Sequence, residues 1–215
     1  MNGRFGAEGW PELTPTTEKH VSGGNVYTDP TGLRWWVLEG YSARQMSHAV
    51  AAAALYNAVG VLAPSLRMVR VGDRARAVHL EPRRWHRLSP EEIRDRHAAE
   101  VERTRIADTW LRNTATIAES CRFREEAIPG LPGVLRLKLT QTLGYRGIGR
   151  LDPGWEAIEV PAITDLQRPL ARAIGRLSQS TIRSAVEGSG LTGAEAISLW
   201  GTLITRQEAI RVALG

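Results

Sequence analysis

The residue types able to act near neutral pH are few and scattered in this chain. None of the five histidines lies in an HExxH motif or another paired spacing typical of metal ligands. His48 falls inside a predicted helix, where it is a candidate acid or base near pH 7, or a helix residue with its tip at the surface. Cys121 is a nucleophile only beside a base that deprotonates it. We therefore predict no metal site and a structural role for Cys121.

Glycine and tryptophan mark the candidate binding features. Gly23, Gly24 and Asn25 precede a predicted strand, and backbone amides in such a turn can hold phosphate, although ordinary turns have the same composition. Trp36 follows another tryptophan on one strand, so the two point to opposite faces. Trp85 lies among the basic residues of 83–87, a pattern of a nucleic-acid or acidic-peptide contact, or of a linker whose tryptophan packs while its arginines stay solvated.

The composition is that of a globular protein, with 42% hydrophobic and 24% charged residues in a chain of 215. No apolar run of 18 residues occurs, the first residues lack the apolar core of a signal peptide, and a single cysteine allows no internal disulfide. We therefore expect a cytoplasmic protein. The net charge of +5 favours anionic partners, but the excess is modest and does not by itself favour nucleic acid.

The first part of the chain predicts a small β-rich lobe at residues 21–82, after a flexible leader at 1–20. Two β-rich runs at 26–28 and 33–38 flank an Asp/Pro/Gly turn and predict an antiparallel hairpin. Ser42 is a candidate N-cap of a helix that ends at Gly60, with Met46, Val50, Ala53 and Ala54 as its buried stripe. A second strand pair follows at 66–71 and 75–80.

The remainder, residues 83–215, predicts a mainly helical large lobe. Ser89 and Glu92 form a candidate capping box at the start of a long helix, and Thr192 with Glu195 forms another near the end of the chain. Ser178 or Ser180 begins a helix between them. An alternating run at 134–139 predicts a strand of an inserted pair. This order of elements predicts an α+β, two-lobed fold with a ligand cleft between the lobes.

Three stretches give the chain a resemblance to the HipA-like protein kinases and their bacterial kinase-fold relatives. Residues 23–37 resemble the hairpin that covers the ATP phosphates, residues 51–64 the small-lobe helix and the strand entry after it, and residues 106–113 with 135–145 the helix before the catalytic loop and the metal-loop strand. The resemblance covers most of residues 21–146. It implies a kinase-like fold and a nucleotide cleft.

The same resemblance implies that the kinase chemistry has been lost. Phosphoryl transfer needs a strand lysine on the phosphates and carboxylates on magnesium. The lysine position is Leu38, the position of the helix glutamate is near Ala49, and the catalytic-loop acid would fall in residues 114–116, which contain none. No asparagine occupies 121–124, and the metal-binding aspartate aligns with Lys138. The resemblance therefore implies a degenerate, pseudokinase-like member that binds no cofactor.

Three functions remain open after this comparison. The first is a binding protein that takes an acidic or phosphorylated peptide or protein partner in the cleft, with Gly23, Gly24, Asn25, Trp36, Arg136 and Arg146 as candidate ligand contacts. The second is an ATP-independent enzyme of ribosomal-peptide modification, as in lanthipeptide biosynthesis, in which Lys138 and His48 assist phosphate elimination or ring closure. The third is an active phosphotransferase with relocated residues. Lys138 is alternatively a surface or salt-bridged strand residue.

Overall fold

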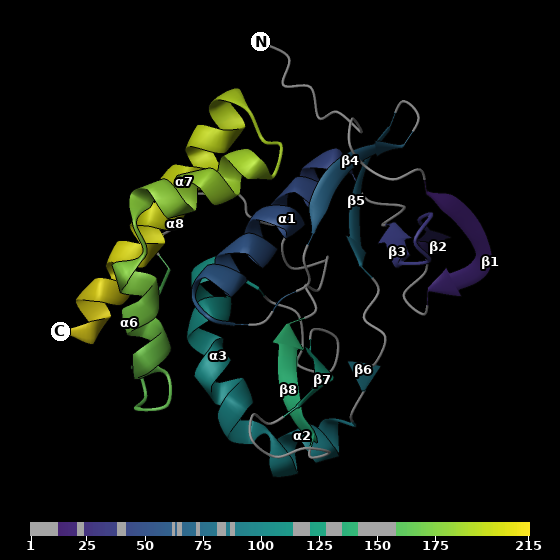
Figure 1. Ribbon diagram of the computed structural model, residues 1–215. Helices are drawn as coiled ribbons and strands as arrows, with labels where there is room; N and C mark the ends of the chain where they lie inside the picture. Colours follow the sequence, from purple (N-terminus) through teal and green to yellow (C-terminus); the bar gives the residue numbers. More distant parts are fainter. Residues whose placement is uncertain are drawn as a thin grey trace.

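The computed structural model describes residues 13–20, 24–37, 42–61, 63, 66–71, 74–80, 85–86, 89–113, 121–127, 135–141 and 158–215. A five-stranded antiparallel sheet comes first, with the strands in the order β1-β2-β3-β5-β4 (Figure 1). Its members are β1 (Thr14–His20), β2 (Gly24–Thr28), β3 (Arg34–Val37), β4 (Arg67–Val71) and β5 (Arg74–Leu80). The two predicted strand pairs are therefore confirmed.

The hairpin between β2 and β3 is built around one carboxylate. Oδ1 of Asp29 accepts hydrogen bonds from the backbone N–H and hydroxyl of Thr31 and from the N–H of Leu33, while Oδ2 accepts from the indole N–H of Trp35. Gly32 has a φ of 80°, a left-handed conformation that a glycine adopts without steric cost. In this predicted Asp/Pro/Gly turn, the aspartate thus accepts the hydrogen bonds of the turn's N–H groups and the glycine adopts the required φ.

Residues 14–20 differ from the expected leader because they form strand β1. Threonine is β-branched and favours extended backbone, and the hydroxyl of Thr16 donates to the carbonyl of Val26 across the strand pair. An ion pair between Arg34 and Glu18 also joins β1 to the hairpin. The expectation of a leader rested on Gly, Pro and Thr content, and that content did not reveal the partner strand.

Helix α1 (Ala43–Ala58) begins with the capping box of Ser42 and Gln45, so the predicted N-cap is confirmed. Ten of its residues are buried, while Ala54, which we expected in the buried stripe, is exposed. The prediction assumed one apolar face. The helix instead packs against β4 and β5 and also against a C-terminal helix, so neighbours on several sides bury it.

The other helices are α2 (Pro90–Arg96), α3 (Ala98–Leu111), α6 (Arg168–Arg176), α7 (Gln179–Gly188) and α8 (Gly193–Leu214). The Ser89 and Glu92 capping box forms, although the long predicted helix is divided at His97 into α2 and α3. Ser178 caps α7. The box predicted at Thr192 does not form, because Gly193 has a φ of 60° and the chain enters α8 in a geometry without a side-chain cap.

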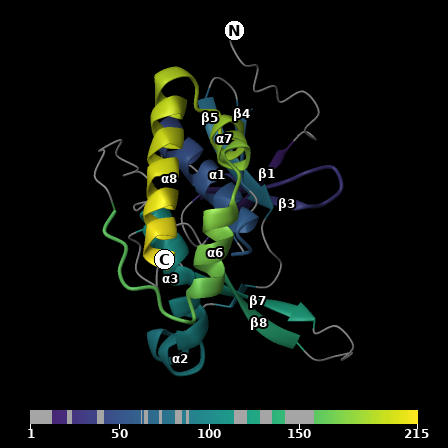
Figure 2. The same cartoon turned by 90° about the vertical axis from the view of Figure 1, so that its left-hand side faces the viewer.

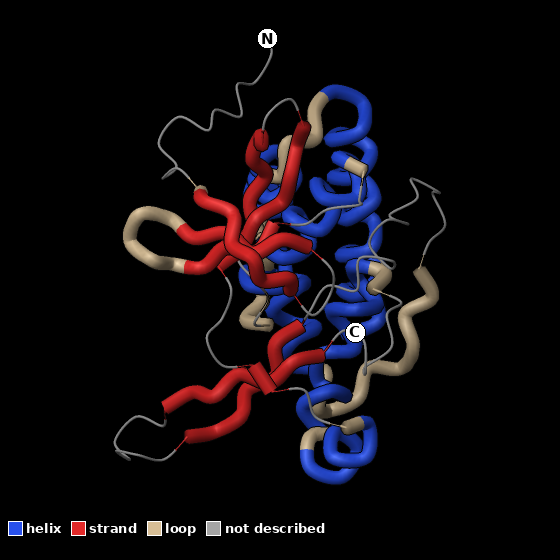
Figure 3. The backbone as a smooth tube through the Cα atoms, turned by 90° about the vertical axis from the view of Figure 1, so that its right-hand side faces the viewer, coloured by secondary structure: helices blue, strands red, loops and turns tan. Residues whose placement is uncertain are grey.

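A second antiparallel sheet has the order β6-β7-β8, with β6 (Trp85–His86), β7 (Cys121–Ala127) and β8 (Leu135–Gln141). Strand β8 confirms the predicted inserted pair. Figure 3 shows the two sheets as separate units on one side of the helices.

The main hydrophobic core joins α1 to the C-terminal helices. Its fully buried members include Tyr56 of α1, Trp110 of α3, Ile174 of α6, Ile182 of α7 and Leu203 of α8. Figure 2 shows α1, α7 and α8 side by side. The expectation of a small antiparallel sheet with a mainly helical remainder is confirmed. A division into two lobes at residue 83 stays a prediction, because this core combines α1 with the helices of the predicted large lobe.

No helix within the described ranges combines the length and apolar character needed to cross a lipid bilayer.

Candidate functional site

The predicted ligand-binding residues near the N-terminus lie on neighbouring strands. Asn25 of β2 is opposite Val37 of β3, and Val26 is opposite Trp36, so Asn25 and Trp36 occupy adjacent rungs of this strand pair. Asn25 is half-buried, and Gly24 pairs with His20 of β1. Gly23 lies outside the described residues. The strand register therefore places Asn25 and Trp36 on neighbouring rungs but on opposite faces of the sheet, so it does not bring these two predicted contacts together.

The predicted basic residues Arg136 and Lys138 lie two positions apart on β8, and therefore on the same face of the second sheet. The register places Trp85, Arg124 and Lys138 in one row across β6, β7 and β8. On the same face, Arg136 lies opposite Glu126, two positions further along the strand pair. Arg146 lies outside the described residues, so nothing tests its placement with the other two.

The composition of the two faces of this sheet differs strongly. The alternating positions that share a face with Lys138 are mostly basic: Arg122, Arg124 and Glu126 on β7, and Arg136 and Thr140 on β8. The opposite face holds mainly apolar residue types: Phe123, Leu135, Leu137 and Leu139 among them. Such an amphipathic sheet is typical of one that covers a core with one face and presents charge with the other.

His48 lies in a cavity at the N-terminal halves of α1 and α8. The side chain is buried at 3% exposure, and the cavity has a volume of about 180 Å³. Arg44 lies one turn before His48, and its Nε is 3.2 Å from a carboxylate oxygen of Glu195 at the start of α8. The described residues that line this cavity come from α1 and α8: Arg44, His48, Ala194, Glu195, Ser198, Leu199 and Thr202.

A polar network at the ends of α1 and α3 was not foreseen from the sequence. The hydroxyl of Tyr56 donates to Asp108 at 2.5 Å and accepts from the side-chain amide of Asn113 at 3.1 Å. The backbone N–H of Asn113 donates to the carbonyl of Asp108, and Arg112 between them has a φ of 53°. This network fixes the chain just before residues 114–116, where the resemblance places the catalytic-loop acid.

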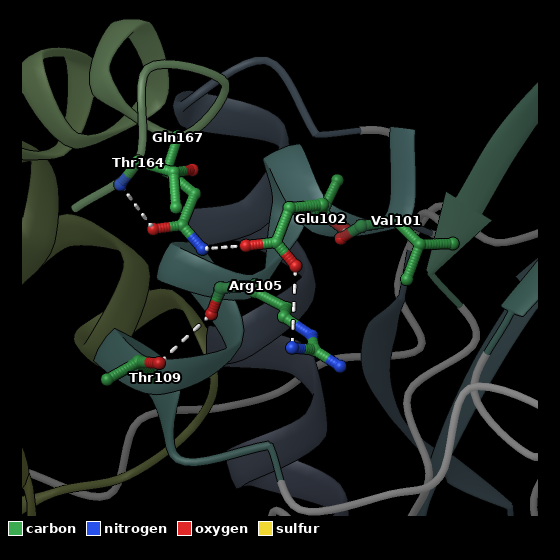
Figure 4. A network of polar contacts seen from close by, with 7 residues as sticks. Val101, Glu102, Arg105, Thr109, Thr164 and Gln167 are labelled. Carbon is green, nitrogen blue, oxygen red and sulfur yellow. Dashed lines mark hydrogen bonds and ion pairs between the residues drawn. The ribbon is translucent and has the colours of Figure 1, made fainter. Parts of the chain in front are cut away.

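A second network fixes the segment before α6 against α3 (Figure 4). The buried side chain of Gln167 donates to Glu102 at 2.7 Å, and its amide oxygen accepts from the N–H of Thr164. The same Glu102 lies 3.4 Å from Arg105, one turn further along α3. The residues directly before α6 therefore lie against the helix that carries Asp108.

Arg206 of α8 is a charged residue inside the core that the sequence analysis missed. It is 1% exposed, and its Nη1 donates to the carbonyl of Trp110 over 3.4 Å. Desolvation by burial, and to a smaller extent the charge of Arg112, lowers the pKa of Arg206 to about 10. The sequence pattern does indicate this burial, because Arg206 lies between Leu203 and Ile210 on the apolar stripe of the helix.

Within the described ranges, no three His, Cys, Asp or Glu side chains come together as metal ligands.

The comparisons with known proteins find structural similarity but no match in sequence. No protein-family model matches the chain, and no curated protein sequence matches it. The structure is similar to the crystal structure of CtkA, a proinflammatory kinase of Helicobacter pylori, with a TM-score of 0.66 at 11% sequence identity. The similarity covers 95% of each chain. The chain therefore has a kinase-like fold.

Proposed function

We propose that this protein uses a kinase-like fold without kinase chemistry, and that it binds an acidic or phosphorylated peptide segment of a partner. The degenerate HipA-like character belongs to this proposal. Fold alone does not determine activity, so the residue types at the positions that phosphoryl transfer requires decide whether this chemistry is retained.

The observation that carries the proposal is the position of the lysines. Active kinases need a lysine on the third strand, paired with a glutamate of the following helix. The chain has two lysines, Lys19 on β1 and Lys138 on β8, so no alignment of β3 provides one. Helix α1 contains no acidic residue along its length. Neither member of the required ion pair is available, whatever the exact register.

The carboxylates that magnesium requires are also missing from two stretches of the sequence. No aspartate or glutamate occurs between Asp108 and Glu119, the stretch that follows α3. None occurs from residue 135 to residue 151, which includes all of β8 and the ten residues after it. At β8, a shift of several residues in the comparison with kinases would still bring no carboxylate to the position of the metal-binding aspartate.

The binding part of the proposal rests on the second sheet. Strand β8 pairs only with β7 in the described sheet, so its other edge can accept an extended segment. The face with Arg136 and Lys138 carries four basic residues against Glu126, which suits phosphate or carboxylate groups on that segment. The edge strand β1 suits a peptide less, since Pro15, Lys19 and an irregular register interrupt it.

The test is a binding titration with fluorescent peptides of one sequence in three forms: phosphoserine, aspartate and alanine. We expect the phosphorylated form to bind most tightly and the alanine form at least tenfold more weakly. Reversing both charges, Arg136→Glu with Lys138→Glu, should weaken the phosphopeptide by more than tenfold, because each reversal replaces attraction by repulsion. The control is Arg183→Glu, an exposed arginine of α7. Equal binding of all three peptides would contradict the proposal.

Nucleotide binding and catalysis are measured on the same material. Magnesium and ATP should leave the melting temperature unchanged, and a clear rise would favour the active phosphotransferase. Mass spectrometry of the phosphopeptide after incubation should show the intact phosphate. Loss of phosphoric acid that depends on Lys138 would instead establish the elimination enzyme.

A further inference from the structure

The guanidinium of Arg206 presents a complete hydrogen-bonding edge that the protein leaves unused. Among the residues that the structure describes, Nη1 donates to the carbonyl of Trp110, whereas Nε and Nη2 are buried and have no hydrogen-bond partner. These two nitrogens carry the parallel N–H groups along one side of the guanidinium plane. That edge is the one with which arginine binds two oxygens of an oxyanion at once.

Leaving such an edge empty is costly. Buried donors in proteins are almost always paired with protein, water or an ion, and a buried charge without a counter-charge is rarer still. Arg206 keeps its proton at neutral pH, since its pKa lies near 10. The packing therefore encloses a positive charge, although α8 otherwise supplies apolar residues such as Leu203 and Ile210 to the core.

A second cation adds to this charge. Arg112 follows α3 directly in the left-handed conformation, and its charge is close enough to disfavour the protonated form of Arg206. Two neighbouring guanidinium groups repel each other, and an anion that contacts both reduces this repulsion. The carbonyl groups at the α3 terminus carry partial negative charge, and the carbonyl of Trp110 accepts one N–H of Arg206.

We propose that Arg206 and Arg112 form a phosphate-binding site at the C-terminal end of α3. A phosphate dianion offers two oxygens to the free edge of Arg206 and enough charge for both arginines. A carboxylate has the same two-oxygen geometry but half the charge, and water has no charge, so both fit less well. The phosphate comes either from solution or from a phosphorylated side chain.

The first experiment uses inorganic phosphate as the probe. Melting temperatures are measured with phosphate and with potassium chloride at equal ionic strength, after incubation, because the edge is covered and uptake requires local opening. A dissociation constant one hundredth of the phosphate concentration corresponds to a rise of roughly 5–10 °C for a chain of this size. No rise above the chloride reference overturns the proposal.

Three variants locate the effect. Arg206→Met keeps an unbranched side chain, removes the charge and should abolish the response to phosphate. Without phosphate it should melt at the same temperature as the parent or higher, because an unpaired buried charge has been removed. Arg206→Lys keeps a charge but lacks the two-pronged edge and should retain only a weak response. The control Arg183→Met changes an exposed arginine of α7 and should respond like the parent.

Two further probes identify the source and class of the anion. Acetate at the same concentration should give a smaller rise than phosphate, and an equal rise would contradict the assignment to phosphate. A phosphoserine peptide whose binding is lost in Arg206→Met would assign the site to phosphorylated partners, and a response to free phosphate alone would assign it to the ion. The site does not rest on the proposed peptide contact at β8, since Arg136→Glu with Lys138→Glu should leave the phosphate response intact.

Discussion

Tyr56 and Asp108 are 52 residues apart in the chain, and a hydrogen bond of 2.5 Å joins them. The phenol lies at the end of α1 and is fully buried, while the carboxylate lies in the last turn of α3. This contact connects the helix next to the five-stranded sheet with helix α3.

Replacing Tyr56 by phenylalanine removes this bond and leaves Asp108 and Asn113 with one partner fewer. A hydrogen bond to a charged group contributes about 1.5–3 kcal/mol to the free energy of unfolding, so we expect a loss of that size. Urea unfolding followed by tryptophan fluorescence measures it. The matched variant Tyr27→Phe, at a half-buried tyrosine outside the network, should change stability by less than about 0.5 kcal/mol.

Gln207 closes the C-terminal end of α6. Its side-chain amide donates to the carbonyls of Ile174 and Leu177, at 2.7 and 2.8 Å. The change Gln207→Met keeps the volume but leaves both carbonyls unpaired in the core, which should lower the free energy of unfolding by about 1–3 kcal/mol. Gln179→Met, at an exposed position of α7, is the control. Equal stability of the two variants in urea would show that these bonds contribute nothing.

Asp29 predicts a pH dependence of stability. The hydroxyl of Thr31 above all, with help from the Trp35 indole and the N–H groups of Leu33 and Thr31, lowers the pKa of Asp29 below its ordinary value of 3.8, against a smaller effect of burial. A carboxyl with a lower pKa in the folded state stabilises the fold above pH 3.8 and loses that contribution as the pH falls through the folded value.

The measurement compares urea unfolding of the parent and of Asp29→Asn between pH 3 and 7. The variant should be less stable at pH 7, and the difference should shrink toward pH 3. Asp165→Asn, at a carboxylate that is 99% exposed, should show no such trend. A constant difference across this range would contradict the assignment of the effect to the charge of Asp29.

The capping box at Ser42 gives a prediction for α1. The hydroxyl of Ser42 accepts from the N–H of Gln45, and the Gln45 side chain accepts from the N–H of Ser42. Ser42→Ala should lower the free energy of unfolding by about 0.5–2 kcal/mol. Ser184→Ala, in the exposed interior of α7, should leave stability unchanged or raise it slightly, since alanine favours helix.

Local signals made part of the fold predictable. The turn at Asp29, the N-cap at Ser42 and the capping box at Ser89 each depend on residues within four positions of one another, and each was predicted correctly. Strand β1 was missed because its bonding partners, such as Val26, become visible only when the strands pair. Thr192 had the right residue type, but Gly193 after it has a φ of 60° and no side-chain cap forms.

The features of the candidate site likewise separate into those that the sequence predicts and those that only the structure shows. Missing residue types, such as the absent third-strand lysine, can be read without coordinates. No distance between His48 and Glu195 can be read from the sequence, so the cavity between α1 and α8 was not foreseen. The bond from Tyr56 to Asp108 and the placement of Arg206 beside Trp110 equally depend on helices that meet only after folding.

The indole N–H of Trp110 donates to the carbonyl of Leu203, across 93 residues. A ribosome therefore has to make most of this polypeptide before that tryptophan can meet its acceptor. Until α8 has been synthesised, the apolar sides of α1 and α3 that it later covers stay exposed. Chaperones that bind nascent chains would bind to these exposed surfaces. Slow steps in translation downstream of α3 should lengthen the time during which these surfaces are exposed and lower the yield of native protein.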